Sequence, residues 1–219
     1  MADLALLASG RDADVFALDE SRVLRHYRQG GDTAPEAEVM AYVAAAGYPV
    51  PAVYAADGPD LVLERLDGET LLDALLAGRI DVGAGAELLV DLHDRLHRLP
   101  ARFSAEPTDR VLHLDLHPQN VMLTSRGPVV IDWRNAAEGP ADLDVAMTAL
   151  IFAEVAVGRD AQLADFAREG LDAFQQRATP PRASQLRSAL GMRRVNPTLS
   201  VVEKAALDHA AALVHTRVG

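Results

Sequence analysis

The residues best suited to chemistry lie between His113 and Asp132. Asp115 is followed five residues later by Asn120, and Asp132 stands directly behind the apolar run Val129–Ile131. Phosphoryl transfer needs a carboxylate that orients the attacking hydroxyl and accepts its proton. It also needs hard oxygen ligands that hold magnesium against the phosphates. Asp115 suits the first task, and Asn120 with Asp132 suits the second.

Strands and a tight loop must position these side chains. The segment 111–123 is predicted to be a loop flanked by apolar residues, and 129–131 a short buried strand. A tight loop between two strands can aim all three side chains at one place. Upstream, the pattern predicts three strands, a helix and two strands, around residues 4–7, 15–18, 23–27, 35–46, 52–55 and 61–64.

The rest of the chain is predicted to be mainly helical, because apolar residues recur there at helical spacing. The expected helices cover roughly residues 70–76, 86–99, 142–157, 160–176, 182–192 and 200–215. The predicted fold class is therefore α+β. Residues 1–66 are predicted to form a lobe with a small antiparallel sheet, and residues 67–219 a mainly helical lobe.

The spacing around Asp115 is similar to that of protein kinases. Their signature is H-R-D-L-x-x-x-N followed by D-F-G. This chain keeps His113, Asp115 and Asn120 at that spacing, but it has Leu114 instead of arginine and Asp132-Trp133-Arg134 instead of D-F-G. The form H-x-D-x-x-x-x-N with I-D-W resembles the aminoglycoside phosphotransferase, choline kinase and fructosamine kinase group.

The later segment 139–146, GPADLDVA, also resembles a helix start of that group. The resemblance covers nearly the whole chain and implies a two-lobed, protein kinase-like fold, in which residues 1–66 are the nucleotide-binding lobe and residues 67–219 the catalytic and substrate-binding lobe. It further implies that Asp115 is the catalytic base and that Asn120 and Asp132 are ligands of Mg²⁺.

The N-terminal lobe matches the group less closely. The family places a lysine for the α- and β-phosphates on the third strand, paired with a glutamate on the next helix. Arg25 stands at the lysine position, and Glu36 stands at the glutamate position with Glu38 nearby. Arginine is always charged but is not interchangeable with lysine. The family's hinge falls at residues 63–68, where the backbone of Glu64 and Leu66 is expected to bind adenine.

The resemblance implies transfer of the γ-phosphate of ATP or GTP to a hydroxyl of a small molecule that is aminoglycoside-, choline- or sugar-like. The alternative is a pseudokinase that binds nucleotide or a partner without turnover. Arg25 is the feature that supports the alternative, while intact Asp115, Asn120 and Asp132 favour the enzyme.

Histidines offer a second interpretation. His93 and His97 are four residues apart on one predicted helix face, a spacing that can bind zinc. The metalloprotease pattern has glutamate where Asp94 stands, and the sequence favours histidines that only pack or face solvent over a zinc site. His113 and His117 flank Asp115 and could also be metal ligands, but the downstream asparagine and aspartate favour the kinase interpretation.

Composition narrows the classes of partner. The net charge of −11 argues against a nucleic-acid partner, since such proteins normally carry a basic face. An acidic surface would suit a cationic substrate, although it also serves solubility. No apolar stretch is long enough to span a membrane, and the first residues do not resemble a secretion signal. With no cysteine in the chain, we predict a cytoplasmic protein without membrane contact.

Overall fold

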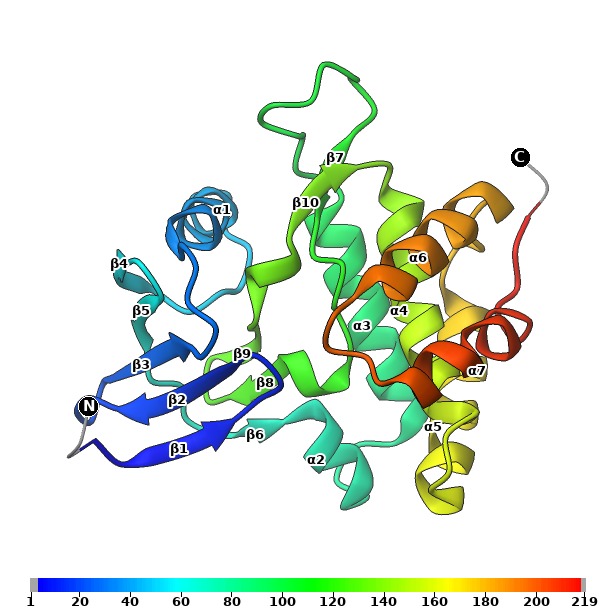
Figure 1. Cartoon of the computed structure of the whole chain (residues 1–219), viewed down its shortest axis with the longest axis horizontal. Coiled ribbons are helices and arrows are strands. Elements are labelled where there is room, and N and C mark those ends of the chain that lie inside the picture. The colour runs from blue at the N-terminus through cyan, green and yellow to red at the C-terminus, as the bar shows by residue number, and fades with distance from the viewer. Residues whose placement is uncertain (1–3, 218–219) are drawn as a thin grey trace. The chain divides into compact units, whose positions relative to one another are not determined.

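Five strands of the N-terminal region pair in the order β1-β2-β3-β5-β4, and each neighbouring pair is antiparallel (Figure 1). The computed structural model describes residues 4–217; residues 1–3, which begin the segment considered for a secretion signal, and 218–219 lie outside that range. The strands are β1 (Leu6–Ser9), β2 (Ala13–Ala17), β3 (Arg22–Tyr27), β4 (Val53–Asp57) and β5 (Asp60–Glu64). The predicted five-stranded antiparallel sheet is confirmed.

Helix α1 (Ala34–Ala45) packs against β4. Its start follows from the sequence, because the Asp32 carboxylate accepts the Ala34 backbone N–H at 2.9 Å and Pro35 stands in the first turn. Its apolar side chains Met40 and Val43 are buried. Glu36 is buried on the same helix, which is unusual for a carboxylate and indicates a charged partner.

A second small sheet has the order β6-β8-β9. Its strands are β6 (Glu69–Thr70), β8 (Val121–Thr124) and β9 (Gly127–Val130). The Val130 backbone N–H donates to the Pro49 carbonyl at 2.9 Å, and the buried Trp133 ring meets Tyr48 edge-on with centroids 5.6 Å apart. These contacts join the end of β9 to the N-terminal sheet region.

The chain consequently forms two compact units. The sheet unit comprises the residues up to Thr70 together with Val121–Arg134, and the helical unit comprises Leu71–Asn120 and the residues from Asn135 onward. The predicted division after residue 66 treats each lobe as one continuous stretch. The segment Val121–Arg134 instead groups with the sheet unit, because its apolar strand and tryptophan are buried there.

Gly68, just before β6, packs closely against the backbone of β8. Its φ is +105°, and a Cβ at this position would lie 1.9 Å from the Leu123 carbonyl oxygen. Gly127 has the same φ of +105° with no atom within 4 Å of such a Cβ. We expect Gly68→Ala to lower the free energy of unfolding by roughly 1–3 kcal/mol more than Gly127→Ala, since only the first adds a clash to the strain. Urea unfolding of the two variants measures the difference, and equal losses would contradict it.

The helical unit contains six helices among the described residues. They are α2 (Leu71–Leu76), α3 (Val82–Leu96), α4 (Ala141–Ala156), α5 (Ala161–Arg177), α6 (Ala183–Val195) and α7 (Val201–Ala211). Two short strands, β7 (Arg110–Leu112) and β10 (Ala137–Gly139), pair antiparallel. A 3₁₀ turn, Pro118–Asn120, precedes β8. Together the two units confirm the predicted α+β class.

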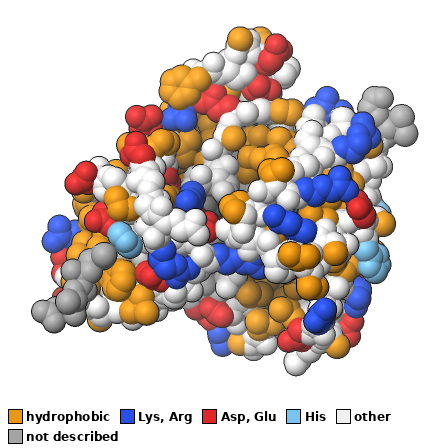
Figure 2. All heavy atoms as spheres, in the orientation of Figure 1, with side chains coloured by type: hydrophobic (Ala, Val, Ile, Leu, Met, Phe, Trp, Pro, Cys, Tyr) orange, Lys and Arg blue, Asp and Glu red, His pale blue; other side chains and the backbone are white. Residues whose placement is uncertain are grey.

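Helix α4 is the centre of the helical unit and packs against α5, α6 and α7. Its residues Ala146, Leu150 and Ala153 are fully buried, and small side chains let the neighbouring helices approach. Over α6 and α7, hydrophobic and basic side chains lie together at the surface (Figure 2); Val195 and Val201 are among the exposed ones. None of the described helices combines the length and the apolar character needed to cross a membrane.

Candidate active site

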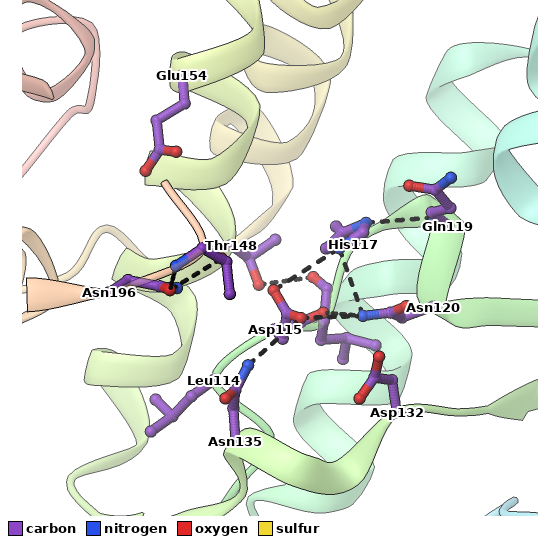
Figure 3. Close-up of polar contacts among 12 residues, drawn as sticks. Leu114, Asp115, His117, Gln119, Asn120, Asp132, Asn135, Thr148, Glu154 and Asn196 are labelled. Carbon is purple, nitrogen blue, oxygen red and sulfur yellow. Dashed lines mark hydrogen bonds and ion pairs between the residues drawn. The ribbon is translucent and has the colours of Figure 1, made fainter. Parts of the chain in front are cut away.

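Asp115 lies on the loop between β7 and the 3₁₀ turn of the helical unit. Asn120 holds this loop closed, because its side-chain amide donates to the Asp115 backbone carbonyl at 2.9 Å and to the Asp115 carboxylate at 3.3 Å. Asn135 donates to the same carboxylate at 3.5 Å, and His117 Nε2 lies 3.7 Å from its other oxygen. Figure 3 shows these three side chains pointing toward Asp115. The carboxylate remains partly exposed, so an acceptor can reach it.

The backbone bends sharply just before Asp115. Leu114 has φ +59°, a left-handed conformation that bulky residues rarely adopt and that costs about 1–3 kcal/mol. Asp144 stabilises the bend, since one carboxylate oxygen accepts the His113 backbone N–H at 2.9 Å and the other accepts the Leu114 N–H at 2.7 Å. A buried carboxylate on α4 thus fixes the direction in which the next residue, Asp115, projects.

Asp144 is completely buried and charged. Burial raises the pKa of its carboxyl, but the imidazoles of His93 and His97 outweigh that effect and hold the pKa well below its usual range. His97 Nε2 lies 3.1 Å from Asp144 Oδ2. Thr148, one turn along α4, donates its hydroxyl to the Leu116 carbonyl at 2.7 Å. The loop around Asp115 is therefore held from α4 on both sides.

Arg25 in the sheet unit joins two carboxylates. Its Nη1 donates to Glu36 at 2.5 Å and its Nη2 donates to Asp132 at 2.5 Å. Arg25 and Glu36 are both buried, whereas the alternative partner Glu38 is exposed. Asp132 has φ +64°, a second left-handed residue, and follows β9 closely. The sheet unit therefore brings together three residues that the sequence singled out.

The charge of Arg25 is secured by these partners. Burial disfavours the guanidinium cation, but the carboxylates of Asp132 and Glu36 outweigh burial and raise the pKa of Arg25 above its ordinary value. Glu36 also accepts a hydrogen bond from the Tyr27 hydroxyl and one from the Trp133 backbone N–H at 3.1 Å. This makes Glu36 the hub of a buried polar network, in which removal of one partner leaves the others unpaired.

The predicted hinge residues lie at the end of β5 and just beyond it. The Glu64 backbone N–H already donates to the Ala52 carbonyl at 2.9 Å, and its carboxylate forms a bidentate ion pair with Arg126 at 2.7 and 2.8 Å. Any bond from the Glu64 backbone to a base must therefore use its carbonyl. Leu66 is partly exposed on the segment that follows.

The amino-acid sequence matches the phosphotransferase enzyme family (APH) over residues 3–110 and 101–186. This chain belongs to that family. No curated protein matches it in sequence.

Solved phosphotransferases have the same fold. A gentamicin complex of APH(2'')-IIa is 15% identical with a TM-score of 0.60, and the alignment covers 97% of this chain and 92% of that chain. A thermostable mutant of APH(4)-Ia with AMP-PNP and hygromycin B is 16% identical with a TM-score of 0.59, covering 97% and 93%. APH(3'')-Id from Streptomyces rimosus is 18% identical with a TM-score of 0.57, covering 88% and 92%. At these identities the likeness establishes the fold, and the predicted two-lobed, kinase-like fold is confirmed.

A family of this kind implies a divalent metal, and the chemistry of two donors fits one. The Asn120 amide nitrogen is occupied by Asp115, which leaves the amide oxygen as the group available to a cation. Asp132 gives one oxygen to Arg25 and keeps a second. Amide and carboxylate oxygens are the ligands that Mg²⁺ prefers. Asn120 belongs to the helical unit and Asp132 to the sheet unit, and their joint binding of one ion stays a prediction.

Several supporting residues were missed from the sequence. Asp144 was noted only within the helix start 139–146, and Asn135 and Thr148 were not singled out. Glu154 on α4 forms a bidentate ion pair with Arg193 on α6 at 2.7 and 2.5 Å (Figure 3 shows Glu154). Burial lowers the pKa of Arg193, but Glu154 first and Asp115 after it raise the pKa above its ordinary value. The negative charge of Asp115 therefore acts on Arg193 of α6. No spacing pattern in the sequence indicates that these two residues interact.

Proposed function

We propose that this protein transfers the γ-phosphoryl group of ATP or GTP to a hydroxyl of a small molecule. The observation that carries the proposal is the bent loop on which Asp115 is presented, partly exposed, with Asn120 bound to it. The polar network of Arg25, Glu36 and Asp132 supports it from the nucleotide side. Family membership supports the reaction class.

In the proposed reaction Asp115 accepts the proton of the acceptor hydroxyl as the oxygen attacks phosphorus. Its hydrogen bonds with Asn120 and Asn135 hold the carboxylate in one orientation, which favours a productive approach. Mg²⁺, when bound, would neutralise phosphate charge, and the oxygens of Asn120 and Asp132 would hold it. Arg25 would balance the remaining charge of the α- and β-phosphates, while Glu64 and Leu66 would bind the base.

The acceptor is proposed to be an aminoglycoside-, choline- or sugar-like compound. Solved relatives with this fold include a gentamicin complex and a streptomycin–ATP complex of APH(2'')-IIa, which concern those proteins. For this chain, the net charge of −11 favours a cationic acceptor through long-range attraction. We further propose that the protein works in the cytoplasm, without nucleic-acid or membrane partners.

A two-step experiment tests the function. Thermal shifts with ATP and with GTP, each with and without Mg²⁺, should reveal a magnesium-dependent increase in melting temperature. Nucleotide consumption is then measured with a panel of aminoglycosides, amino alcohols and sugars. Acceptor-dependent consumption is the expected result. A magnesium-dependent shift without turnover on any acceptor would favour the pseudokinase, and no shift with either nucleotide would contradict both.

The metal assignment predicts the behaviour of Asp132→Asn. This variant keeps the side-chain size but removes the charge, so the magnesium-dependent part of nucleotide affinity should fall by at least about 10-fold. Dissociation constants are measured with Mg²⁺ and with a chelator. Asp57→Asn, an exposed aspartate of the sheet unit, is the control and should behave as the unmodified protein. An equal loss with and without Mg²⁺ would assign Asp132 a structural role instead.

A further inference from the structure

Three metal-ligand side chains gather in the helical unit, apart from the residues assigned to phosphoryl transfer. They are His93 on α3, His97 at the C-cap of α3 and Asp144 on α4, and one ligand atom of each lies within 4.8 Å of the other two. The histidines are four residues apart on one helix face, the spacing that places two imidazoles beside the same ion. His93 and Asp144 are buried, and His97 is nearly so.

Hydrogen bonds fix which nitrogen of a neutral His93 ring carries the hydrogen. The Thr148 hydroxyl has a single hydrogen and donates it to the Leu116 carbonyl at 2.7 Å. Its oxygen can therefore only accept from His93 Nε2, which lies 3.0 Å away. The hydrogen of a neutral ring is thus on Nε2, and Nδ1 carries a lone pair.

That lone pair has no hydrogen-bond partner. His93 Nδ1 is buried and unpaired, and it lies 3.7 Å from Asp144 Oδ2. In the neutral ring a nitrogen lone pair and a carboxylate oxygen thus face each other in the interior, so the stabilising effect of His93 on the Asp144 anion requires a cation, either a proton or a metal ion, between the two atoms. Buried polar atoms are nearly always paired, so this arrangement points to a cation as the missing partner.

We propose that His93 Nδ1, His97 Nε2 and Asp144 Oδ2 bind one divalent transition-metal ion, with Zn²⁺ as the best match. Zinc ligands at about 2.0–2.1 Å in tetrahedral geometry lie roughly 3.3–3.4 Å apart. The observed separations from Asp144 Oδ2 are 3.7 Å to His93 and 3.1 Å to His97, on either side of that value. Thr148 orients the His93 ring through its other nitrogen, as is usual for histidines that bind metals.

A cavity adjoins the cluster and has room for a fourth ligand. Its volume is about 460 Å³, and both histidines line it together with Asp94, Asp142 and Arg182. Water in a cavity of this size can complete a tetrahedron around zinc. The site does not depend on the proposed phosphoryl transfer, because no residue of the cluster is assigned as base, magnesium ligand or nucleotide contact, and Asp144 supports the Asp115 loop only through the backbone.

A metal ion bound to this cluster would also affect the loop that carries Asp115. Asp144 Oδ2 also accepts the His113 backbone N–H, and Asp144 Oδ1 accepts that of Leu114. An ion on Asp144 would therefore stabilise the bend ahead of Asp115. Binding of zinc should accordingly raise the melting temperature as well as saturate at one equivalent.

The test uses chelator-treated protein freed of any affinity tag. Zn²⁺ is titrated against a chromophoric competitor with excess Mg²⁺ present, because magnesium prefers oxygen ligands and occupies other sites. We expect one equivalent to bind, with affinity reduced at least roughly 100-fold in His97→Ala and roughly 10–100-fold in Thr148→Val. His209→Ala, an exposed histidine of α7, is the matched control and should bind zinc normally.

Equal zinc affinity in the unmodified protein and His97→Ala would overturn the site, as would the absence of a bound equivalent. If His97→Ala does not fold, X-ray absorption of the zinc-loaded unmodified protein decides the question. Two imidazoles in the coordination sphere are expected, and one or none would overturn the proposal. Loss of nucleotide turnover leaves these measurements unaffected, so the two proposals fail separately.

Discussion

Asp115→Asn is expected to lower kcat by about 10²–10⁴-fold and to leave nucleotide affinity largely unchanged, because it removes a general base without removing a metal ligand. That factor corresponds to roughly 3–5 kcal/mol of activation free energy. Asparagine keeps the size of the side chain and an oxygen that can still accept from Asn120. The variant therefore tests basicity more directly than alanine does.

The measurement pairs kcat on an accepted substrate with the nucleotide dissociation constant. Asp172→Asn, an exposed aspartate of α5, controls for the loss of one negative charge in the helical unit and should keep normal turnover. Near-normal kcat in Asp115→Asn would refute the base assignment. Lost nucleotide binding in a folded variant would instead indicate a structural or metal role for Asp115.

Much of the fold could be predicted from the sequence because its main elements carry periodic patterns. Predicted helices at 142–157 and 160–176 correspond to α4 and α5 within a residue or so at each end. The short strands β6, β7, β8 and β10 were not predicted. Strands of this length contain too few residues to show alternation, and they form only because segments far apart in sequence pair, as β6 does with β8.

The spacing of the candidate catalytic residues around Asp115 could also be predicted from the sequence, but the residues that support their loop could not. The segment 139–146 offers two aspartates, and only burial separates their roles. Asp142 is half-buried and pairs with Arg182, whereas Asp144 is fully buried and holds the loop at Leu114. Nothing in the local sequence distinguishes them. Tertiary hydrogen bonds decide which residue supports the loop.

The contact between Arg25 and Asp132 is another feature beyond sequence reasoning, since these residues are 107 positions apart. The aligned position predicted a glutamate partner for Arg25, and Glu36 is that partner. Asp132 was predicted only as a metal ligand. Because Arg25 holds both carboxylates through separate amino groups, its replacement should have a large effect on stability as well as on nucleotide binding.

Arg25→Ala is expected to lower the free energy of unfolding by about 3–5 kcal/mol, because it leaves the buried Glu36 carboxylate without its cation. Arg22→Ala is a matched control on the same strand. Arg22 is half exposed and pairs with Asp19 at the surface, so its loss should cost no more than about 1 kcal/mol. Chemical unfolding of both variants gives the comparison.

Arg25→Lys tests whether the positive charge at this position is sufficient or whether the forked shape of the guanidinium is also needed. Lysine supplies a cation for Glu36 but has a single ammonium group, so it cannot reproduce the two separate contacts of the guanidinium fork. Its stability should fall between those of the unmodified protein and Arg25→Ala. A loss as small as that of Arg22→Ala in both Arg25 variants would show that the network contributes little to folding.

Nucleotide affinity completes the test of Arg25. The family carries lysine at this position, so Arg25→Lys should preserve or raise affinity for Mg²⁺-nucleotide, whereas Arg25→Ala should weaken it clearly. Lysine also loosens the hold on Asp132, which frees that carboxylate for the metal. Binding is measured at a temperature where each variant is folded, so that lost stability is not mistaken for lost affinity. Equal affinity in all three proteins would remove Arg25 from the nucleotide site and leave it a purely structural residue that joins Glu36 to Asp132.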